Sequence, residues 1–485
     1  MTLSDLMLNM KVILPMTVLI AWSCILLLVD LFIPKGRKGW TALLAALGLL
    51  VCLGLTISQA GWVSSGFNGM VIHDGFSFFL NILFLGSGLA GIAVAFDYLR
   101  RMDIERGEYY ILLLFSISGM MLMSQANDLI VVFLALELLS IPLYILSGFA
   151  RPRVESEEAA LKYFLMGAFA GGFVVFGVAL VFGATGTTNL GAIVNSISAN
   201  IANMQLLTIG AALILVGMGF KVAVVPFHMW TPDVYHGAPS AVSAFMSVGA
   251  KAGGFAALLR IFITAFPSLA SELTMIFWTL SALTMFLGNV VAIAQGNIKR
   301  MLAYSSIAHA GYIMMALVPF GNAAVNPEVV SASLFYLAAY AFTSFGAWAV
   351  VIALEKAEGG GLTLDDYAGL GRKYPLLAAS MAVFMLSFTG IPPTLGFMGK
   401  FYLFRTVIEG GYLGLALIGV FTSLISAYYY LRVIVIMYMR DGEPMARKEF
   451  WVRFTAAAAA VLVVALSLAA GPLLDLASEA VITKF

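Results

Sequence analysis

The chain has 485 residues, of which 62% are hydrophobic and 11% are charged, and its formal net charge is +1. This is more apolar side chain than the core of a soluble protein buries, so we expect a polytopic membrane protein surrounded by lipid. A net charge near zero without a basic block excludes the clustered positive surface that nucleic-acid binding needs. Cys24 and Cys52 lie singly in apolar runs, so the cysteine pattern predicts neither a disulfide framework nor a metal cluster.

Apolar segments long enough to cross a bilayer, which takes roughly 20 residues, recur along the whole chain. They lie near residues 13–33, 39–58, 75–98, 108–125, 127–149, 158–183, 205–226, 239–265, 271–295, 299–319, 328–353, 375–408, 411–439 and 454–476. The sequence therefore predicts an all-α membrane protein with about 14 transmembrane helices. The first segment is followed by "PKGRKGW" instead of a small-residue cleavage site, so we expect it to be retained.

Basic residues in the loops predict the orientation. The loops after odd-numbered helices hold Lys35, Arg37, Lys38, Arg100, Arg101, Arg106, Arg151, Arg153, Lys299, Arg300, Lys356, Arg372, Lys373, Arg440, Arg447, Lys448 and Arg453. The loops after even-numbered helices hold none. Because basic loops stay in the cytoplasm, we expect both termini on the opposite side of the membrane.

Two of the predicted helices are interrupted. The seventh runs into Pro226 and Pro232, and the twelfth contains "TGIPPTLGFMGKF". A proline break at membrane depth is tolerated only where protein or a wet cavity satisfies the freed backbone groups. Paired breaks of this kind are typical of inverted repeats built around an ion or substrate path.

The spacing of the two breaks predicts how the chain is divided. Helices four to eight and helices nine to thirteen form two groups of five, in which the seventh and twelfth helices are equivalent. Because each group has an odd number of helices, the second group inserts upside down relative to the first. We therefore expect N-terminal helices at 1–104, a first repeat at 105–268, a second inverted repeat at 269–440, and a last helix at 441–485.

Charged side chains inside the predicted helices are the candidate functional residues, because an unpaired charge is costly to bury. Lys221, Lys251 and Lys400 lie deep, which favours function over packing. Glu137, in the middle of "VVFLALELLSIPLY", is the carboxylate that matches them, with a structural ion pair as the alternative. A glutamate that moves toward or away from a buried lysine would load or release a proton.

The remaining polar residues have alternatives that the sequence leaves open. Lys162 could snorkel or function, and Glu158 lies four residues earlier on the same helix face. His309 could hold water for proton transfer or pack helices. We expect Arg260 and Arg405 to snorkel to the membrane interface and Arg432 to be an intermediate case. We expect His228, Asp233 and His236 to cap helix ends that face the cytoplasm.

Three stretches carry a resemblance to a known family. They are "GFKVAVVPFHMWTPDVYHGAPSAVSAF", "NIKRMLAYSSIAHAGY" and "LSFTGIPPTLGFMGKFYLF". They resemble the antiporter-like membrane subunits of proton-pumping NADH:quinone oxidoreductase, respiratory complex I, and among these subunit N most. The resemblance covers helices four to thirteen, and the lysine in the broken twelfth helix favours subunit N.

The resemblance implies roles for the residues named above. Glu137, Lys221, Lys251 and Lys400 would carry protons, with Lys400 facing the exit, and Glu158 with Lys162 matches a sixth-helix pair of that family. It implies no cofactor in this chain, with quinone, flavin and iron–sulfur clusters in partner subunits. The expected partners are lipid, another antiporter-like subunit and a small neighbouring membrane subunit, in a bacterial inner membrane.

Two other functions stay open at this point. A multisubunit cation/proton antiporter shares the fold and the lysines, although the "PDVYHGAP" form argues against it. A membrane scaffold that transports nothing has no reason to keep buried charges. The chain has no nucleotide-binding motif, so we expect its energy to come from an ion gradient or from partner subunits.

Overall fold

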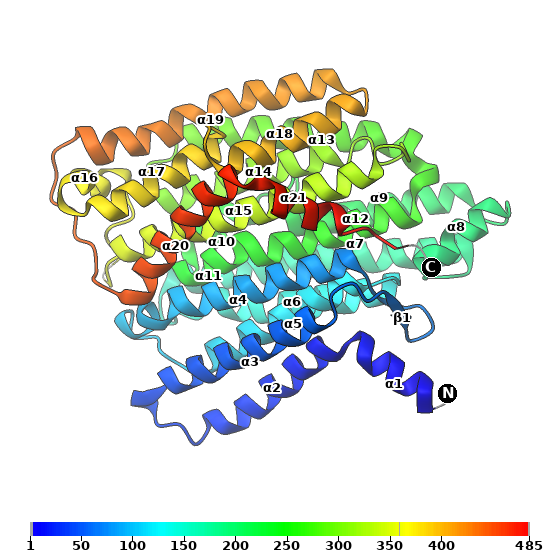
Figure 1. The fold of residues 1–485 in the computed structure, drawn as a ribbon, viewed down its shortest axis with the longest axis horizontal. Coiled ribbons are helices and arrows are strands. Elements are labelled where there is room, and N and C mark those ends of the chain that lie inside the picture. The colour runs from blue at the N-terminus through cyan, green and yellow to red at the C-terminus, as the bar shows by residue number, and fades with distance from the viewer. Residues whose placement is uncertain (1–2, 358, 484–485) are drawn as a thin grey trace.

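The computed structural model describes residues 3–357 and 359–483 as a bundle of long helices lying side by side (Figure 1). The N-terminal part comprises α1 (Leu3–Val12), α2 (Leu14–Asp30), η1 (Lys35–Arg37), α3 (Gly39–Ser58), β1 (Ser64–Gly66), β2 (Val71–His73) and α4 (Gly75–Arg101). The strands form one antiparallel hairpin in which Ser65 pairs with Ile72. The all-α class predicted from the sequence is therefore confirmed apart from this small hairpin.

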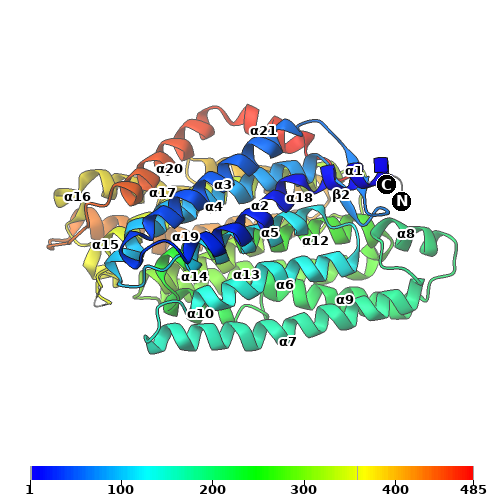
Figure 2. The ribbon, with the colours of Figure 1, turned by 90° about the horizontal axis from the view of Figure 1, so that it is seen from below.

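The region of the first predicted repeat contains α5 (Glu108–Gln125), α6 (Leu129–Ser147), α7 (Val154–Thr185), α8 (Leu190–Ser198), α9 (Met204–Val222), α10 (Trp230–Gly237), α11 (Ser240–Phe245), the π-helical turn η2 (Met246–Ala250), α12 (Lys251–Ala265) and η3 (Pro267–Leu269). In the view of Figure 2, α7 and α9 form the lower edge of the bundle. Gly177 and Gly210 let these two helices approach closely, since a Cβ on Gly177 would lie 2.7 Å from the Gly210 carbonyl oxygen.

The remaining elements are α13 (Ala270–Ile293), α14 (Ile298–Ala316), α15 (Asn326–Leu354), η4 (Leu364–Tyr367), α16 (Leu370–Lys373), α17 (Pro375–Thr389), α18 (Leu395–Glu409), α19 (Leu413–Met439), α20 (Phe450–Leu468) and α21 (Ala470–Glu479). Helix α15 is central: it packs against α4, α14, α17, α18 and α20 and is buried over 94% of its most apolar stretch. It therefore forms the core around which the second half is arranged.

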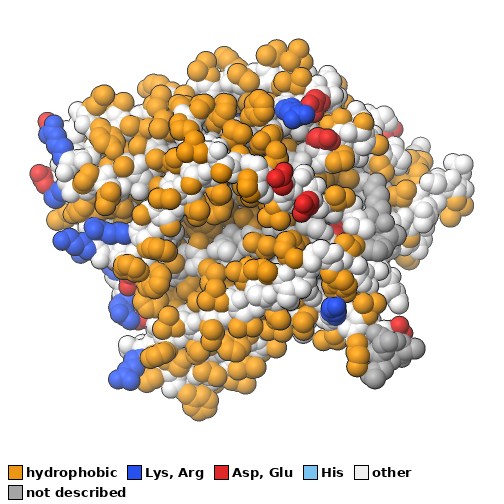
Figure 3. Space-filling model, viewed as in Figure 1, with side chains coloured by type: hydrophobic (Ala, Val, Ile, Leu, Met, Phe, Trp, Pro, Cys, Tyr) orange, Lys and Arg blue, Asp and Glu red, His pale blue; other side chains and the backbone are white. Residues whose placement is uncertain are grey.

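Ten helices among the described residues are long and apolar enough to cross a membrane, and an eleventh span results if α1 and α2, bent by 73°, count as one. The other three predicted spans are present as α5, as α14 and as the interrupted pair α17 and α18. Basic side chains gather at one end of the bundle, at the left of Figure 3, while apolar side chains dominate the face between the ends. The count of fourteen spans stays a prediction.

Both predicted helix breaks are present. Helix α9 ends at Val222, before the prolines, because Ala223 adopts a left-handed φ of 63° and the Val224 N–H turns back to the Gly219 carbonyl. Helix α17 ends at Thr389, and Gly390 supplies the left-handed conformation there with a φ of 87°. Each break leaves a helix C-terminus inside the bundle.

A matching backbone pattern in the two halves supports the proposed repeats, which remain a prediction. Asp128, the N-cap of α6, forms a β-bridge with Asn189, which follows α7. Asn297, the N-cap of α14, forms the same bridge with Thr363, which follows α15. In both cases the first helical N–H is donated across the bridge, from Leu129 to the Thr188 carbonyl and from Ile298 to the Leu362 carbonyl.

The prediction that Arg260 snorkels to the interface is wrong. Its side chain is 1% exposed, and its guanidinium donates to both carboxylate oxygens of Asp74 at 2.8 and 3.0 Å. It also donates to the Ser124 carbonyl, so a fully buried ion pair joins α4, α5 and α12. Arg405, by contrast, is 60% exposed and pairs with Glu409. The sequence could not separate these two arginines because Asp74, the partner that allows burial, is 186 residues away from Arg260.

Candidate functional site

Lys221 lies in the last turn of α9, directly before the break, and is 4% exposed. Its amine donates to the Ser140 hydroxyl of α6 at 2.8 Å and to the Tyr163 hydroxyl of α7 at 3.1 Å. Trp230 of α10 stacks on the Tyr163 ring with centroids 4.5 Å apart. The chain segment after the break thus fixes the phenol that holds the lysine.

Glu137 of α6 is half-buried and lies beside α7, where a Cβ on Gly171 would be 3.2 Å from the carboxylate. The carboxylate and the Lys221 amine interact electrostatically, but no hydrogen bond or ion pair joins them among the described residues. Ser140, three residues along α6 from Glu137, holds the amine instead. The two charged groups therefore interact without a direct hydrogen bond, so a rotamer change of Glu137 can alter their separation.

Lys251 is the second buried amine, at the first residue of α12 and 3% exposed. It follows the π-helical turn η2, a backbone irregularity common at functional sites. Its amine donates to the Ser306 hydroxyl of α14 at 2.5 Å and contacts the Ser306 carbonyl. One turn further along α12, Gly254 packs on the Lys221 stem, since a Cβ there would be 3.3 Å from Lys221 Cγ.

His309 of α14 connects Lys251 to the second half through aromatic side chains. Lys251 lies over the Tyr340 ring at 5.7 Å, and that ring is 5.2 Å from the imidazole. The imidazole shares hydrogen bonds with the hydroxyls of Tyr336 at 2.5 Å and Tyr430 at 3.1 Å. A buried imidazole between two phenols can relay a proton, because each partner both donates and accepts.

Lys400 is another buried amine and is 4% exposed. It extends from α18 back to the broken end of α17, where it donates to the carbonyls of Phe388 at 2.9 Å and Thr389 at 3.0 Å. It also donates to the Ser423 hydroxyl at 2.7 Å. A helix C-terminus carries partial negative charge, so these carbonyls stabilise an ammonium without a carboxylate.

The described contacts form a nearly continuous polar line between the last two lysines. His309 and Tyr312 are one turn apart with rings 5.8 Å from each other, and Lys400 lies 4.6 Å from the centre of the Tyr312 ring. Ser305 extends the line sideways to Tyr430 at 2.5 Å. Of the predicted residues, the structure therefore brings Lys251, His309 and Lys400 together in one line, which Lys221 approaches at Gly254.

Lys162 and Glu158 lie apart from this line. Lys162 is 41% exposed and pairs at 2.7 Å with both Glu158 and Asp233, and Asp233 in turn pairs with Arg300 at 2.9 Å. These contacts form a surface network between α7, α10 and α14. Burial alone would raise the pKa of Asp233, but hydrogen bonds from Lys162 and Arg300 hold it below its ordinary value.

The prediction that His228, Asp233 and His236 cap helix ends is wrong for the start of α10, whose N-cap is Met229 and has no side-chain cap. Asp233 lies in the first turn with its carboxylate directed to two cations from other helices. His228 is buried, and His236 lies in the last turn. An N-cap residue directly precedes its helix, whereas Met229 lies between His228 and α10, and Asp233 and His236 lie inside the helix.

Sequence patterns did not single out the Ser140, Tyr163 and Ser423 hydroxyls that hold lysine amines, the Tyr336 and Tyr430 hydroxyls that bond His309, or the Tyr340 ring beside Lys251. One signal was available, because a tyrosine deep in an apolar helix needs a partner for its hydroxyl. That signal does not say which tyrosines face the lysines. Within the described ranges, no group of three or more His, Cys, Asp or Glu side chains is placed to hold a metal ion.

Comparison with known proteins identifies the family. The profile described as NADH:quinone oxidoreductase/Mrp antiporter, TM, matches residues 126–426, the region that holds every candidate residue. The chain belongs to this family. NADH-quinone oxidoreductase subunit N of Chloroflexus aggregans is 47% identical over 98% of this chain and 97% of its own length. Subunit N of Trichlorobacter lovleyi is 45% identical over 98% of this chain and 96% of its own.

Solved structures of the antiporter-like family share the fold. A chain of respiratory complex I from Thermus thermophilus is 36% identical, with a TM-score of 0.83, and the match covers 96% of this chain and 99% of that one. A chain of the Mrp complex from Dietzia is 20% identical, with a TM-score of 0.85 over 98% and 97% of the two chains. The second likeness shows the fold alone.

Proposed function

We propose that this chain is subunit N of an NADH:quinone oxidoreductase and translocates protons through its buried lysines, driven by redox chemistry in partner subunits. The observation that carries the proposal is the line of buried amines, hydroxyls and imidazole described above, in a chain 47% identical to a subunit N. Ionisable groups inside a membrane protein are expensive and typically mark such relays.

Glu137 and Lys221 form the switch in this proposal. When the carboxylate approaches, it stabilises the ammonium, and when it withdraws, the Ser140 and Tyr163 hydroxyls can hold a neutral amine equally well because they also donate. The proton then passes to Lys251, whose helix packs on the Lys221 stem. From there His309 and its phenols lead to Lys400, which delivers it on the far side.

The surface network around Asp233 is assigned to the uptake side. Glu158, Lys162, Asp233 and Arg300 lie where α7, α10 and α14 meet, and α10 begins after the break that carries Lys221. A movement of α10 would shift both Asp233 and Trp230, which stacks on Tyr163. The network thus links the surface mechanically to the residue that holds Lys221.

Partner subunits supply the energy in this proposal. We expect flavin, iron–sulfur clusters and quinone there, together with contacts to another antiporter-like subunit and to a small membrane subunit. The relatives named NADH-quinone oxidoreductase subunit N support the assignment to such a complex. The chain would then be part of an enzyme while its own side chains carry only protons.

A cation/proton antiporter subunit is the alternative. The fold is shared with the Mrp complex, but at 20% identity, against 36% for the chain from complex I. Isolating the assembly through a tag on this chain separates the two functions. We expect co-isolated subunits with flavin and NADH:quinone reductase activity; an assembly that lacks both and exchanges sodium for protons would contradict the proposal.

The location proposed is a bacterial inner membrane with the basic end of the bundle in the cytoplasm and both termini on the other side. The loop "RRMDIERGE" after α4 tests this arrangement, because Arg106 in it is exposed at that end. A cysteine placed there should stay unlabelled when an impermeant thiol reagent is added to intact cells, and should react after the cells are opened. Labelling from outside would invert the topology.

A further inference from the structure

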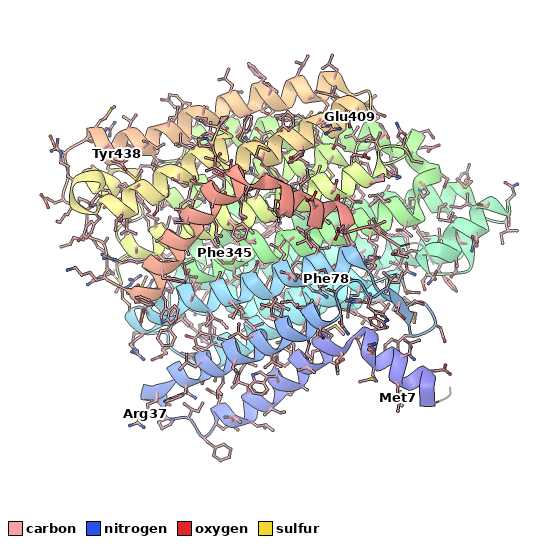
Figure 4. The ribbon with its side chains drawn as sticks, in the orientation of Figure 1. Met7, Arg37, Phe78, Phe345, Glu409 and Tyr438 are labelled. Atoms are coloured by element: carbon pink, nitrogen blue, oxygen red, sulfur yellow. The ribbon has the colours of Figure 1, made fainter. Side chains whose placement is uncertain are left out.

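A large apolar cavity opens on the face drawn in Figure 3, away from the proton line. Its volume is about 600 Å³, and its walls come from α3, α4, α15, α20 and α21. We call it the α4–α20 groove. Phe345 of α15 forms part of its floor and is labelled in Figure 4 between α20 and α4.

The walls of the α4–α20 groove are almost wholly apolar. Ser87, Thr455 and the indole N–H of Trp451 are the polar groups among its described lining residues, and the Thr455 hydroxyl already donates to the Trp451 carbonyl at 2.8 Å. Much of the remaining wall is alanine, including Ala42, Ala90 and Ala459. An occupant must therefore be apolar where it lies in the groove.

The groove is long enough to hold an extended acyl chain. Its lining runs along α4 from Phe79 to Phe96, which is about 25 Å at 1.5 Å per residue. An acyl chain is apolar and flexible along its length, so it can follow these walls in a cavity of about 600 Å³.

Cations and aromatic rings lie at one end of the groove. The Arg100 side chain is 59% exposed, one turn beyond Phe96, and its nearest recorded acid is Glu105 at 3.5 Å. A Cβ on Gly39, at the start of α3, would be 3.3 Å from Phe96 and 3.8 Å from Arg100. Arg37, two residues before Gly39, is exposed, as are Trp40 and Trp451. Interfacial aromatics beside arginines are typical of lipid headgroup level.

Neighbouring cations at this end are already paired. Lys38 pairs with Asp30 at 2.6 Å, and Arg101 pairs with Glu449 at 2.5 Å, both with side chains at most 12% exposed. Arg100, whose pair with Glu105 is long at 3.5 Å and leaves its side chain 59% exposed, and the exposed Arg37 can meet an external anion. Their positive charge is complementary to a phosphate group positioned above the open end of the groove.

We propose that the α4–α20 groove binds one acyl chain of an anionic phospholipid whose phosphate contacts Arg100 at the basic end of the bundle. The bound chain would lie against Ala338, Ala341 and Phe345 of α15. The same helix presents Tyr336 to His309 and Tyr340 to Lys251. The lipid thus supports, from behind, the helix that carries two phenols of the proton line.

The test uses the purified assembly reconstituted with photoreactive phosphatidylglycerol or phosphatidylcholine, each with a diazirine in the middle of an acyl chain. Mass spectrometry of the cross-linked peptides should place phosphatidylglycerol on α4 and α20, with several-fold less labelling by phosphatidylcholine. Equal labelling by the two lipids would overturn the headgroup assignment. Labelling confined to other helices would overturn the site.

Two pairs of variants sharpen this test. Gly86 lines the groove and Gly54 lies on the exposed outer face of α3, and a Cβ at either position meets nothing within 4 Å. Gly86→Leu should lower labelling of α4 several-fold while Gly54→Leu leaves it unchanged, although both raise helix propensity equally. Arg100→Gln should remove the preference for phosphatidylglycerol. Arg405→Gln, at a side chain 60% exposed, is its control and should keep that preference.

A protein helix is the occupant that this test must distinguish from a lipid. With Ala90→Cys in the groove wall, disulfide formation with cysteines placed in a neighbouring subunit would show that a helix lies in the groove, and would overturn the proposal. Retention of labelling in Gly86→Leu at the native level would do the same. None of these readouts depends on NADH oxidation or proton movement, so the lipid site can fail while the proposed function stands.

Discussion

Lys221 and Lys400 lie at the two helix breaks, yet different groups hold their amines. Hydroxyls of Ser140 and Tyr163 hold Lys221, with the Glu137 carboxylate nearby but not hydrogen-bonded to it. Backbone carbonyls at the end of α17 hold Lys400 together with the Ser423 hydroxyl. No acidic side chain pairs with Lys400 in the described part of the chain.

This difference separates a movable site from a fixed one. Side chains such as Glu137 can change rotamer and so alter the field at Lys221, and hydroxyls accept or donate as the amine requires. Carbonyls at a helix end only accept, and they move only if α17 moves. We therefore propose that the first half holds the switch, whereas the second half holds a station whose ammonium is stabilised by backbone carbonyls in fixed positions.

Lys251, between the two sites, should give the largest functional effect. Its recorded partners, Ser306 and the Tyr340 ring, carry no charge, so Lys251→Ala strands no buried ion. We expect the assembly to form normally and the number of protons pumped per quinone reduced to fall, because a positioned proton carrier is worth roughly a hundredfold in rate or more. Proteoliposomes with a pH-sensitive dye measure the ratio. Loss of assembly in this variant would instead indicate a structural role.

Stability should then distinguish the two breaks. Lys400→Met leaves the Phe388 carbonyl buried without its recorded donor, which costs about 1 to 3 kcal/mol, while the Thr389 carbonyl keeps the Ser423 hydroxyl. In Lys221→Met the freed Ser140 and Tyr163 hydroxyls can rotate to other acceptors, so we expect a smaller loss. Thermal unfolding of the two variant assemblies measures the difference. A lower melting temperature for Lys221→Met than for Lys400→Met would contradict the distinction.

The smallest effect should come from the surface network. The Asp233 side chain, which pairs with Lys162 and Arg300, is 37% exposed. Each of these ion pairs therefore stabilises the fold by only about 0 to 1 kcal/mol. The folded pKa of Asp233 is below its ordinary value, so its contribution is present above that ordinary pKa and is lost only as the pH falls through the folded one. Melting curves of Asp233→Asn between about pH 6 and 8 should run parallel to those of the native chain. A pH-dependent gap in that window would contradict this assignment.

The sequence was sufficient for the class, the two breaks and the buried amines of Lys221, Lys251 and Lys400, because lysine and proline in apolar segments are costly and therefore conspicuous. It failed for Lys299, which was assigned to a loop but is 2% exposed and donates to the Ala238 carbonyl. It placed Lys251, His309 and Lys400 among the candidates, and the structure brings them into one line. The cost of burial is a local property, visible without knowing what lies opposite.

Partners were not predictable, because they come from helices distant in the sequence. Arg260 has the sequence position of an interfacial arginine, but its partner Asp74 lies 186 residues away in the chain. Tyr163, which holds the Lys221 amine, lies 58 residues from that lysine. The pairing of Lys162 with Glu158 was predictable since it spans one helical turn, but the contact with Asp233 was not. Local spacing predicts contacts along one helix, whereas the contacts that define a site cross between helices.

The Glu137→Gln, Lys221→Met double variant tests the central claim most directly. Removing one member of a structural ion pair should cost about 3 to 5 kcal/mol, while replacing both can be nearly neutral. If the pair is a proton switch, the double variant should assemble like the native chain but pump fewer protons per quinone reduced, as each single variant does. A double variant that assembles and pumps at the native ratio would show that Lys221 is held in the membrane for structure alone.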